Sequence, residues 1–212
     1  MNTSTETSSH PAPPVTLAVE PIAGTDRGQI TLPEGRVIVY RPIEPSDQEA
    51  LQRFHRRLSD QTVFFRFFGP LRELSTARAV YFTNVDGYNR FALVALDPDQ
   101  PGDLIAVARI DREPGTNRAE YAAVVVDEWQ GRGLGFALTK CLIDAARARG
   151  IKCFYAIVLP ENLRMLNLLR DLGLPRRVRW ADGAERIEVD ITAPLDPAGV
   201  TIENKPSTGA DQ

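Results

Sequence analysis

Short apolar runs rich in β-branched residues alternate along the chain with polar segments that contain Gly, Pro or Asp. Runs of this length and composition are typical of β-strands. They predict strands over residues 36–41, 91–96, 104–111, 120–126, 153–158, 178–180 and 186–191. The Asp-, Pro- and Gly-rich segment 97–103 predicts a hairpin loop, and Asp182-Gly183 predicts the turn of a final hairpin.

Between these strands, apolar residues recur at the spacing of one helix face. The first helix is expected to begin at Ser46, because Glu49 stands three residues on and completes the pattern of a capping box. Ser75 is expected to cap the second helix. The third covers 133–149 and the fourth covers 162–172, each followed by a glycine that favours a helix end.

The resulting order, β-α-α-β-β-β-α-β-α-β-β, predicts an α/β fold with a mixed sheet. Antiparallel strands lead into one β-α-β crossover. A dinucleotide-binding fold would have its glycine-rich turn after the first strand, whereas here that turn follows the fourth. The order therefore argues against a dinucleotide-binding fold.

The chain of 212 residues is long enough for one domain with tails. Residues 1–34 are polar and Pro-rich without a sustained apolar period, and we expect a flexible N-terminal tail there. We expect the folded domain over 35–193 and a flexible C-terminal tail over 194–212.

Composition and charge exclude several classes of function. The net charge of −3 provides no basic field for nucleic acid, and no apolar run approaches the ~20 residues of a membrane span. The first residues lack the apolar core of a secretion signal, and Cys141 and Cys153 are too few for a disulfide framework, so we expect a cytoplasmic protein. With only His10 and His55 as histidines, we expect no metal.

The segment from Val124 to Gly135 is the strongest candidate for chemistry. An apolar strand ends, an acidic turn follows, and glycines open a helix. Unpaired N–H groups at a helix N-terminus bind phosphate, and glycines let the backbone approach it. The expected binding residues are Val124, Val125, Val126, Gln130, Gly131, Arg132, Gly133, Leu134 and Gly135. Gln130 and Arg132 are expected to add side-chain donors.

A structural glycine loop before an ordinary helix is the alternative interpretation of this segment. The context of a strand, Gln-x-x-Gly-x-Gly and then an amphipathic helix favours phosphate binding. A P-loop is excluded, because no Gly-Lys-Ser/Thr follows.

Gln130-x-x-Gly133-x-Gly135 after a Val-rich strand resembles the acyl-CoA motif of the GCN5-related N-acetyltransferases (GNAT). The resemblance covers about residues 37–191. Arg41-Pro42-Ile43, the segment 58–68 and Ala119-Glu120-Tyr121-Ala122 are most similar to the GNAT domains of bacterial Pat-type protein lysine acetyltransferases.

This resemblance implies the GNAT fold, in which a mostly antiparallel mixed sheet splays between its two central strands. Acetyl-CoA would be the co-substrate, with its pantetheine arm in the gap between strands 120–126 and 153–158. A bulge in the first of these strands would free N–H groups for that arm. Pat-type proteins often carry a regulatory domain, and we expect any such regulation to come from another chain.

Asn162 matches the family position whose side-chain amide contacts the CoA arm. A plain helix N-cap after Pro160 is the alternative role, and one residue can serve both.

Glu120 is the candidate general base. A lysine amine has a pKa of about 10.4, so a base must remove a proton before it attacks a thioester near neutral pH. An acid in an otherwise apolar strand is unusual, and we expect burial to raise the pKa of Glu120. Glu120 also matches the Pat-type position; an exposed strand-edge carboxylate is the alternative. It could act directly or through water.

The general acid of many family members, a tyrosine, is replaced by Leu169. Tyr155 is a weak substitute and is expected in the core, so the acid is unassigned. The phenylalanines of segment 64–68 are candidates for the wall of the acceptor cleft or for the core. Arg66 among them is expected either to face an acidic substrate group or to extend along apolar surface, and His55 is expected to be structural.

Acetyl transfer from acetyl-CoA to an amine is therefore the expected function, with a protein lysine as the favoured acceptor. A small-molecule amine is the first alternative, and a non-catalytic acyl-CoA-binding regulatory module is the second. We expect a monomer or homodimer.

Overall fold

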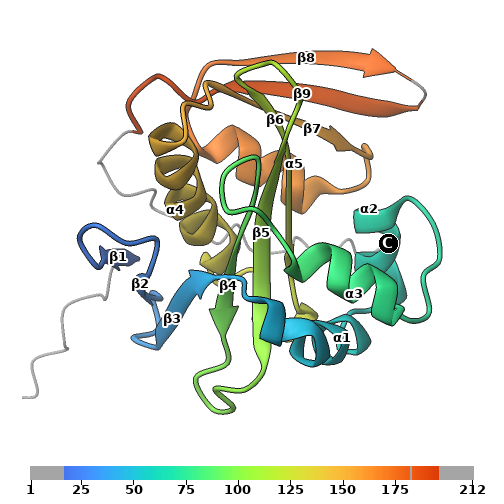
Figure 1. Ribbon diagram of the computed structural model, residues 1–212. Helices are drawn as coiled ribbons and strands as arrows, with labels where there is room; N and C mark the ends of the chain where they lie inside the picture. Colours follow the sequence, from blue (N-terminus) through green and yellow to red (C-terminus); the bar gives the residue numbers. More distant parts are fainter. Residues whose placement is uncertain (1–16, 182, 196–212) are drawn as a thin grey trace, which may run out of the picture.

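The fold is organised around one mixed sheet, shown in Figure 1. A computed structural model describes residues 17–181 and 183–195. In this part of the chain, nine strands form the sheet in the order β1-β2-β3-β4-β5-β6-β7-β9-β8. The strands are β1 (Ala18–Pro21), β2 (Gly28–Thr31), β3 (Val37–Pro42), β4 (Arg90–Leu96), β5 (Leu104–Arg112), β6 (Arg118–Val125), β7 (Cys153–Val158), β8 (Arg176–Ala181) and β9 (Ala184–Asp190).

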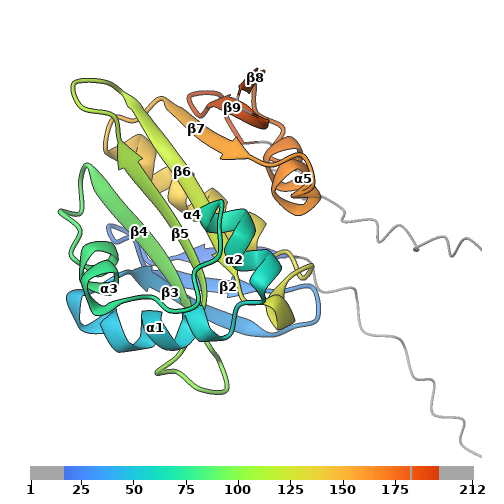
Figure 2. The ribbon, with the colours of Figure 1, turned by 90° about the vertical axis from the view of Figure 1, so that its right-hand side faces the viewer.

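Helices cover both faces of this sheet. They are the short 3₁₀ helices η1 (Pro45–Asp47) and η2 (Asp127–Trp129), and the α-helices α1 (Gln48–Arg56), α2 (Asp60–Phe67), α3 (Thr76–Thr83), α4 (Leu134–Ala148) and α5 (Leu163–Asp171). In Figure 2, α1, α2 and α3 lie in front of the sheet and α4 lies behind it. Leu93, Val94 and their neighbours on β4 are fully buried, because both faces of the strand are covered. The predicted α/β class with a mixed, mostly antiparallel sheet is confirmed.

The central strands β6 and β7 are the parallel pair of the sheet, and they separate. Their register begins with Arg118 opposite Cys153 and ends with Glu120 opposite Tyr155. Beyond this point, residues 121–125 of β6 have no partner on β7. Figure 2 shows the two strands diverging toward α5 and α2. The predicted splay is therefore present.

The expected bulge in β6 is wrong. The ladder joins residues 106–112 of β5 to residues 119–125 of β6 without a register shift. A bulge is unnecessary, because the N–H groups of a strand point alternately to its two edges. Separation from β7 by itself leaves one edge of β6 without a partner strand.

The expected N-terminal tail is wrong for its second half, because β1 and β2 extend the sheet beyond β3. Ile30 and Leu32 are fully buried, although the segment is too short to show an apolar period. Gly28 is required in β2, since an added Cβ would lie 2.4 Å from the carbonyl oxygen of Glu20. The ordered domain thus begins well before residue 35, while 1–16 and 196–212 lie outside the described residues.

Two helix predictions also need correction. The first helical segment begins at Pro45, one residue before Ser46, and Glu44 and Asp47 form the capping box instead. Helix α2 was not predicted, because its phenylalanines follow one another without helical spacing. It begins at Ser59, whose hydroxyl accepts a hydrogen bond of 3.2 Å from the N–H of Thr62. Ser75 caps α3 as predicted.

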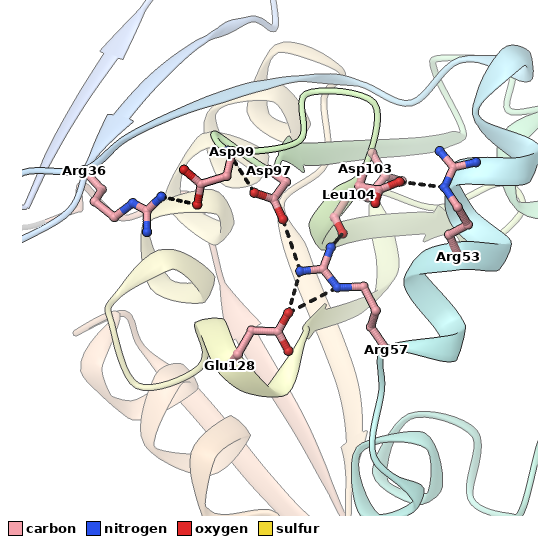
Figure 3. A network of polar contacts seen from close by, with 8 residues as sticks. All are labelled: Arg36, Arg53, Arg57, Asp97, Asp99, Asp103, Leu104 and Glu128. Atoms are coloured by element: carbon pink, nitrogen blue, oxygen red, sulfur yellow. Dashed lines mark hydrogen bonds and ion pairs between the residues drawn. The ribbon is translucent and has the colours of Figure 1, made fainter.

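Ion pairs attach α1 to the β4–β5 loop and to η2, as Figure 3 shows. Arg57 donates to Asp97 at 3.1 Å and also to Glu128 on η2. Arg53 donates to Asp103 at 2.6 Å. These contacts hold the end of α1 next to the turn that leads into α4.

Within residues 17–181 and 183–195, no helix is long and apolar enough to cross a membrane. The same residues contain no cluster of three or more His, Cys, Asp or Glu side chains arranged to hold a metal ion.

Candidate functional site

The gap between β6 and β7 opens into a cleft of about 450 Å³. Strands β6 and β7 and helices α2, α4 and α5 all contribute to its walls. Of the predicted site residues, those that line it are Glu120, Val124, Val125, Gln130, Gly131, Gly133, Gly135 and Asn162. The structure therefore brings the predicted base and most predicted binding residues together in one cleft.

The turn after η2 and the first turn of α4 (together residues 130–136, the glycine loop) present free backbone donors. Gly131 and Gly133 have φ values of 74° and 85°, in the left-handed region that favours glycine. The N–H groups of residues 131–136 donate no hydrogen bond to another described residue. They lie at the positive end of the α4 dipole, so this loop has the donor set that an anionic phosphate requires.

Gly135 has a packing role in addition. A Cβ added there would lie 3.3 Å from the side chain of Val125 and 3.5 Å from that of Leu168. The absence of a side chain therefore lets the first turn of α4 approach both β6 and α5.

The predicted side-chain donors are placed differently from each other. The amide nitrogen of Gln130 donates to the carbonyl oxygen of Val125 at 2.8 Å, so this side chain closes the loop internally. The guanidinium of Arg132 lies 5.1 Å from the Trp129 ring and 3.5 Å from Glu34, outside the residues that line the cleft. Arg164 of α5, which sequence analysis missed, donates to Gln130 and lines the cleft instead.

Val126 and Leu134 are almost completely buried and do not line the cleft. The N–H of Val126 donates to Ile105 on β5 at 3.0 Å. Because N–H groups alternate between the two edges of a strand, those of Ala123 and Val125 point toward β7. With β7 displaced, these edge donors face the cleft, which is the arrangement for pairing with an extended ligand.

Asn162 serves as the N-cap of α5, as predicted. Its side-chain oxygen accepts a hydrogen bond of 3.2 Å from the N–H of Met165. This bond leaves the amide NH₂ group free to donate, and the residue lines the cleft. Both roles considered for Asn162 are therefore geometrically compatible.

Glu120 lies in the cleft but is exposed, so the expected burial of its carboxylate is wrong. It stands opposite Asp111 in the β5–β6 ladder and opposite Tyr155 in the β6–β7 ladder. Exposure at a splayed edge follows from the loss of the neighbouring strand.

Leu169, at the position of the tyrosine acid in other family members, is 1% exposed and cannot serve as an acid. Tyr155 is half-buried beside Glu120 and not in the core, which corrects its expected placement. Burial and the Glu120 carboxylate raise the pKa of Tyr155. Its side chain is outside the residues that line the cleft, so the acid stays unassigned.

Helix α2 forms the wall of the cleft opposite α5. Phe65, Arg66 and Phe68 line the cleft, while Phe64 is exposed and Phe67 points toward α1 and α3.

Asp127, which sequence analysis missed, attaches α2 to the start of the glycine loop. Its carboxylate accepts from the N–H of Ser59 at 2.9 Å, the Ser59 hydroxyl at 2.7 Å and the Thr62 hydroxyl at 2.9 Å. Burial acts to raise the pKa of Asp127, but these hydrogen bonds outweigh it and the pKa is lowered. No local sequence pattern links residues so far apart in the chain.

Comparison with known proteins agrees with this geometry. Residues 48–174 match the sequence model of the acetyltransferase (GNAT) family, whose members use acetyl-CoA. The chain is 32% identical over 145 residues to Acetyltransferase PA5475 of Pseudomonas aeruginosa, covering 68% of this chain and 77% of that protein. It is 33% identical over 168 residues to Acetyltransferase Pat of Mycolicibacterium smegmatis, covering 77% of this chain and 50% of Pat.

A solved structure is similar over nearly its whole length. The GNAT domain of S. lividans PAT superposes with a TM-score of 0.73 at 34% sequence identity, covering 81% of this chain and 99% of that domain. The splayed pair, the free amides of the glycine loop and these similarities lead to one conclusion. The chain belongs to the GNAT family, is similar to Pat acetyltransferases, and is an acyl-CoA-dependent N-acetyltransferase.

Proposed function

We propose that this enzyme transfers the acetyl group of acetyl-CoA to the side-chain amine of a protein lysine. The glycine loop binds the pyrophosphate through the N–H groups of residues 131–136. The free edge of β6 pairs with the pantetheine arm, and Asn162 donates its amide to that arm. Arg164, which donates to Gln130 of this loop, adds positive charge beside the phosphates.

Glu120 is the general base of this proposal. Its carboxylate takes a proton from the acceptor ammonium, directly or through water, and the amine nitrogen then attacks the thioester carbon. An N–H on the open edge of β6 polarises the carbonyl oxygen. As the C–S bond breaks, the nitrogen releases its second proton to water and becomes the amide. The CoA thiolate leaves without a protein acid, or takes a proton from water.

One observation carries this proposal most directly. The free amides of the glycine loop and the Glu120 carboxylate line the same cleft, at opposite ends of the exposed edge of β6. A donor thioester lying along that edge would therefore extend toward the base. An exposed carboxylate is also accessible to a large acceptor such as a protein side chain.

The choice of a protein lysine as acceptor is supported by the similarity to Pat. It is also supported by the segments 41–43, 58–68 and 119–122, which resemble Pat-type GNAT domains. A small-molecule amine is the alternative acceptor. We further propose a cytoplasmic enzyme, since both cysteines are free thiols, as in a reducing compartment. A monomer or homodimer is part of the same proposal.

The test measures acetyl-CoA turnover against a panel of proteins and small amines, with acetylated sites located by mass spectrometry. We expect turnover with a protein lysine and its loss in Glu120→Gln. If only small amines support turnover, the acceptor is a small-molecule amine and not a protein lysine. Tight CoA binding without turnover on any acceptor would favour the non-catalytic regulatory module.

A further inference from the structure

A second, smaller pocket of about 50 Å³ lies beneath α2, between α1, α3 and the sheet. We call it the arginine pocket, because Arg66 and Arg109 line it among mostly apolar side chains. Arg66, Ala122 and Val124 line both this pocket and the cleft. The arginine pocket is therefore adjacent to the cleft, and the two share a wall.

Arg109 is the main anomaly in this pocket. Only 5% of the residue is exposed, and its Nε and Nη2 atoms have no hydrogen-bond partner among the described residues. The nearest carboxylate, Asp111, lies 3.6 Å from Nη2 and already accepts from Arg90 at 3.1 Å. Because an unsatisfied buried cation is costly, these donors need an explanation.

Arg66 adds a second guanidinium, which lines both the arginine pocket and the cleft. It forms no hydrogen bond or ion pair with any described residue, and it lies over the Phe67 ring at 5.2 Å. Burial lowers its pKa, while the carboxylates of Glu120 and Asp111 oppose that effect. Burial also lowers the pKa of Arg109, to about 10, so this group is charged at neutral pH. A guanidinium group does not lose its proton in proteins, so Arg66 carries a positive charge as well.

His55 is a further unsatisfied group in the same wall. It is 4% exposed, and both ring nitrogens lack a partner among the described residues. Burial lowers its pKa, so the ring is neutral at pH 7 and can donate one hydrogen bond. The pocket thus collects donors without supplying matching acceptors.

The local charges favour an anion over water as the partner of these donors. Arg66, Arg90 and Arg109 face Asp111 and Glu120, which leaves one positive charge in excess. A bound water would satisfy hydrogen bonds but not that charge. A carboxylate supplies both, and its planar oxygens match the guanidinium fork.

The pocket lies at a short distance from the proposed base. Arg109 stands opposite Ala122 in the β5–β6 ladder, and Glu120 is two residues from Ala122 on the same face. Residues in such a diagonal relation are about 7–8 Å apart. An acceptor whose amine reaches Glu120 can therefore place a nearby acidic group at Arg109.

We propose that the arginine pocket is a specificity subsite that binds a carboxylate of the acceptor through Arg66 and Arg109. This inference rests on the proposed acetyl transfer to an amine at Glu120. The carboxylate has two possible sources with the same chemistry: an acidic side chain next to the target lysine, or the acid group of a small amino acid. The arginine pocket and Glu120 together thus select an acceptor that carries a carboxylate close to its amine.

Pairs of acceptors that differ only in this group test the proposal. Lysine peptides with a flanking Glu or Gln examine the first source, and 5-aminovalerate against 5-aminovaleramide examines the second. We expect at least about 10-fold higher kcat/KM for the acid in one pair. In Arg66→Gln and Arg109→Lys the preference collapses, through KM for the acceptor, while KM for acetyl-CoA is unchanged. Equal use of acid and amide by the wild type would overturn the proposal.

Matched controls separate this effect from damage to the fold. Arg78→Gln removes an exposed arginine of α3 that has no side-chain partner among the described residues, and it should keep the preference. Arg66→Gln breaks no hydrogen bond to a described residue, so it keeps the test valid if Arg109→Lys fails to fold. A folded Arg66→Gln enzyme that keeps the preference for the acid contradicts the assignment of the arginine pocket as the subsite. This holds whether or not Arg109→Lys folds.

A binding measurement distinguishes this subsite from the proposed activity. The Nε–H resonance of Arg109, assigned by its loss in Arg109→Lys, should shift when 5-aminovalerate or the Glu peptide is added to the full chain. The matching amides should leave it in place. A shift without turnover would keep the subsite and reject the proposed function, whereas no shift with either acid rejects the subsite.

Discussion

The donor side and the acceptor side of the cleft are built in different ways. The donor side consists of backbone: the amides of residues 131–136 and the open edge of β6. The proposed acceptor side, taken together with the arginine pocket beside it, consists of side chains from separate elements, namely Arg66 on α2, Arg109 on β5 and Glu120 on β6. The loop amides are set by a local turn, whereas the open edge of β6 and the side-chain set depend on tertiary packing.

This difference suggests how each half can change. A backbone site depends on conformation, so substitutions affect it mainly when they alter φ or add a Cβ. A side-chain site depends on the identity of each residue. We therefore expect the donor half to bind a cofactor shared across the family and the acceptor half to vary between relatives.

The largest expected effect is on the acceptor side. Glu120→Gln keeps size and hydrogen bonding but removes the base, so we expect kcat/KM for the amine to fall by about 10²–10³-fold. KM for acetyl-CoA should stay the same. Glu73→Gln, at an exposed position away from the cleft, is the matched control. Full activity of Glu120→Gln would exclude the base role and leave the donor site intact.

A smaller effect is expected from the donor side. Gly133→Val forces a β-branched residue into a left-handed conformation with φ of 85° and places a Cβ in the glycine loop. We expect KM for acetyl-CoA to rise by about 10-fold or more, with a loss of roughly 1–3 kcal/mol in unfolding free energy. Gly150→Val, at φ 75° after α4, carries the same backbone strain far from the cleft. Equal KM values for the two variants would argue against phosphate binding by the loop.

The connection between the two halves predicts a moderate effect. Asp127→Asn weakens the hydrogen bonds that attach α2 to the glycine loop, and we expect a loss of about 1–2 kcal/mol at pH 7. Asp60→Asn, an exposed acid at the first position of α2, is the control.

The pH dependence of this variant sharpens the prediction. The folded-state pKa of Asp127 is lowered below the unfolded value of about 3.9, so its stabilisation is present above that pH. It is lost as pH falls through the folded-state pKa. The difference in stability between wild type and Asp127→Asn should therefore be constant from pH 7 to about 5 and shrink in more acidic solution. A difference that does not depend on pH would contradict the role of the charged carboxylate.

The smallest expected effect separates the two roles of Asn162. Asn162→Ala removes the cap of α5 and should lower the unfolding free energy by about 1 kcal/mol. Asn162→Ser keeps a capping oxygen but lacks the amide, so its stability should match the wild type. A rise in KM for acetyl-CoA in both variants would support the contact with the CoA arm. An unchanged KM in Asn162→Ser would show that Asn162 acts only as the N-cap of α5.

Sequence reasoning was most successful where the structure is local. The glycine loop, the N-caps at Ser75 and Asn162, and α4 all depend on residues close together in the chain, and each is confirmed. It failed for α2, whose consecutive phenylalanines hide the helical period. It also failed for the β1–β2 hairpin, whose strands are too short for an apolar pattern and are stabilised by pairing with β3.

The sequence by itself determined the glycine loop of the proposed donor half. A strand, a glycine-rich turn and a helix N-terminus follow one another directly, and their backbone geometry needs no distant partner. Only the tertiary structure decided the acceptor half. The register of β5 on β6 places Arg109 beside Ala122, and the docking of α2 through Asp127 brings Arg66 over them. Such a constellation is set by packing between elements far apart in the chain, which no local pattern encodes.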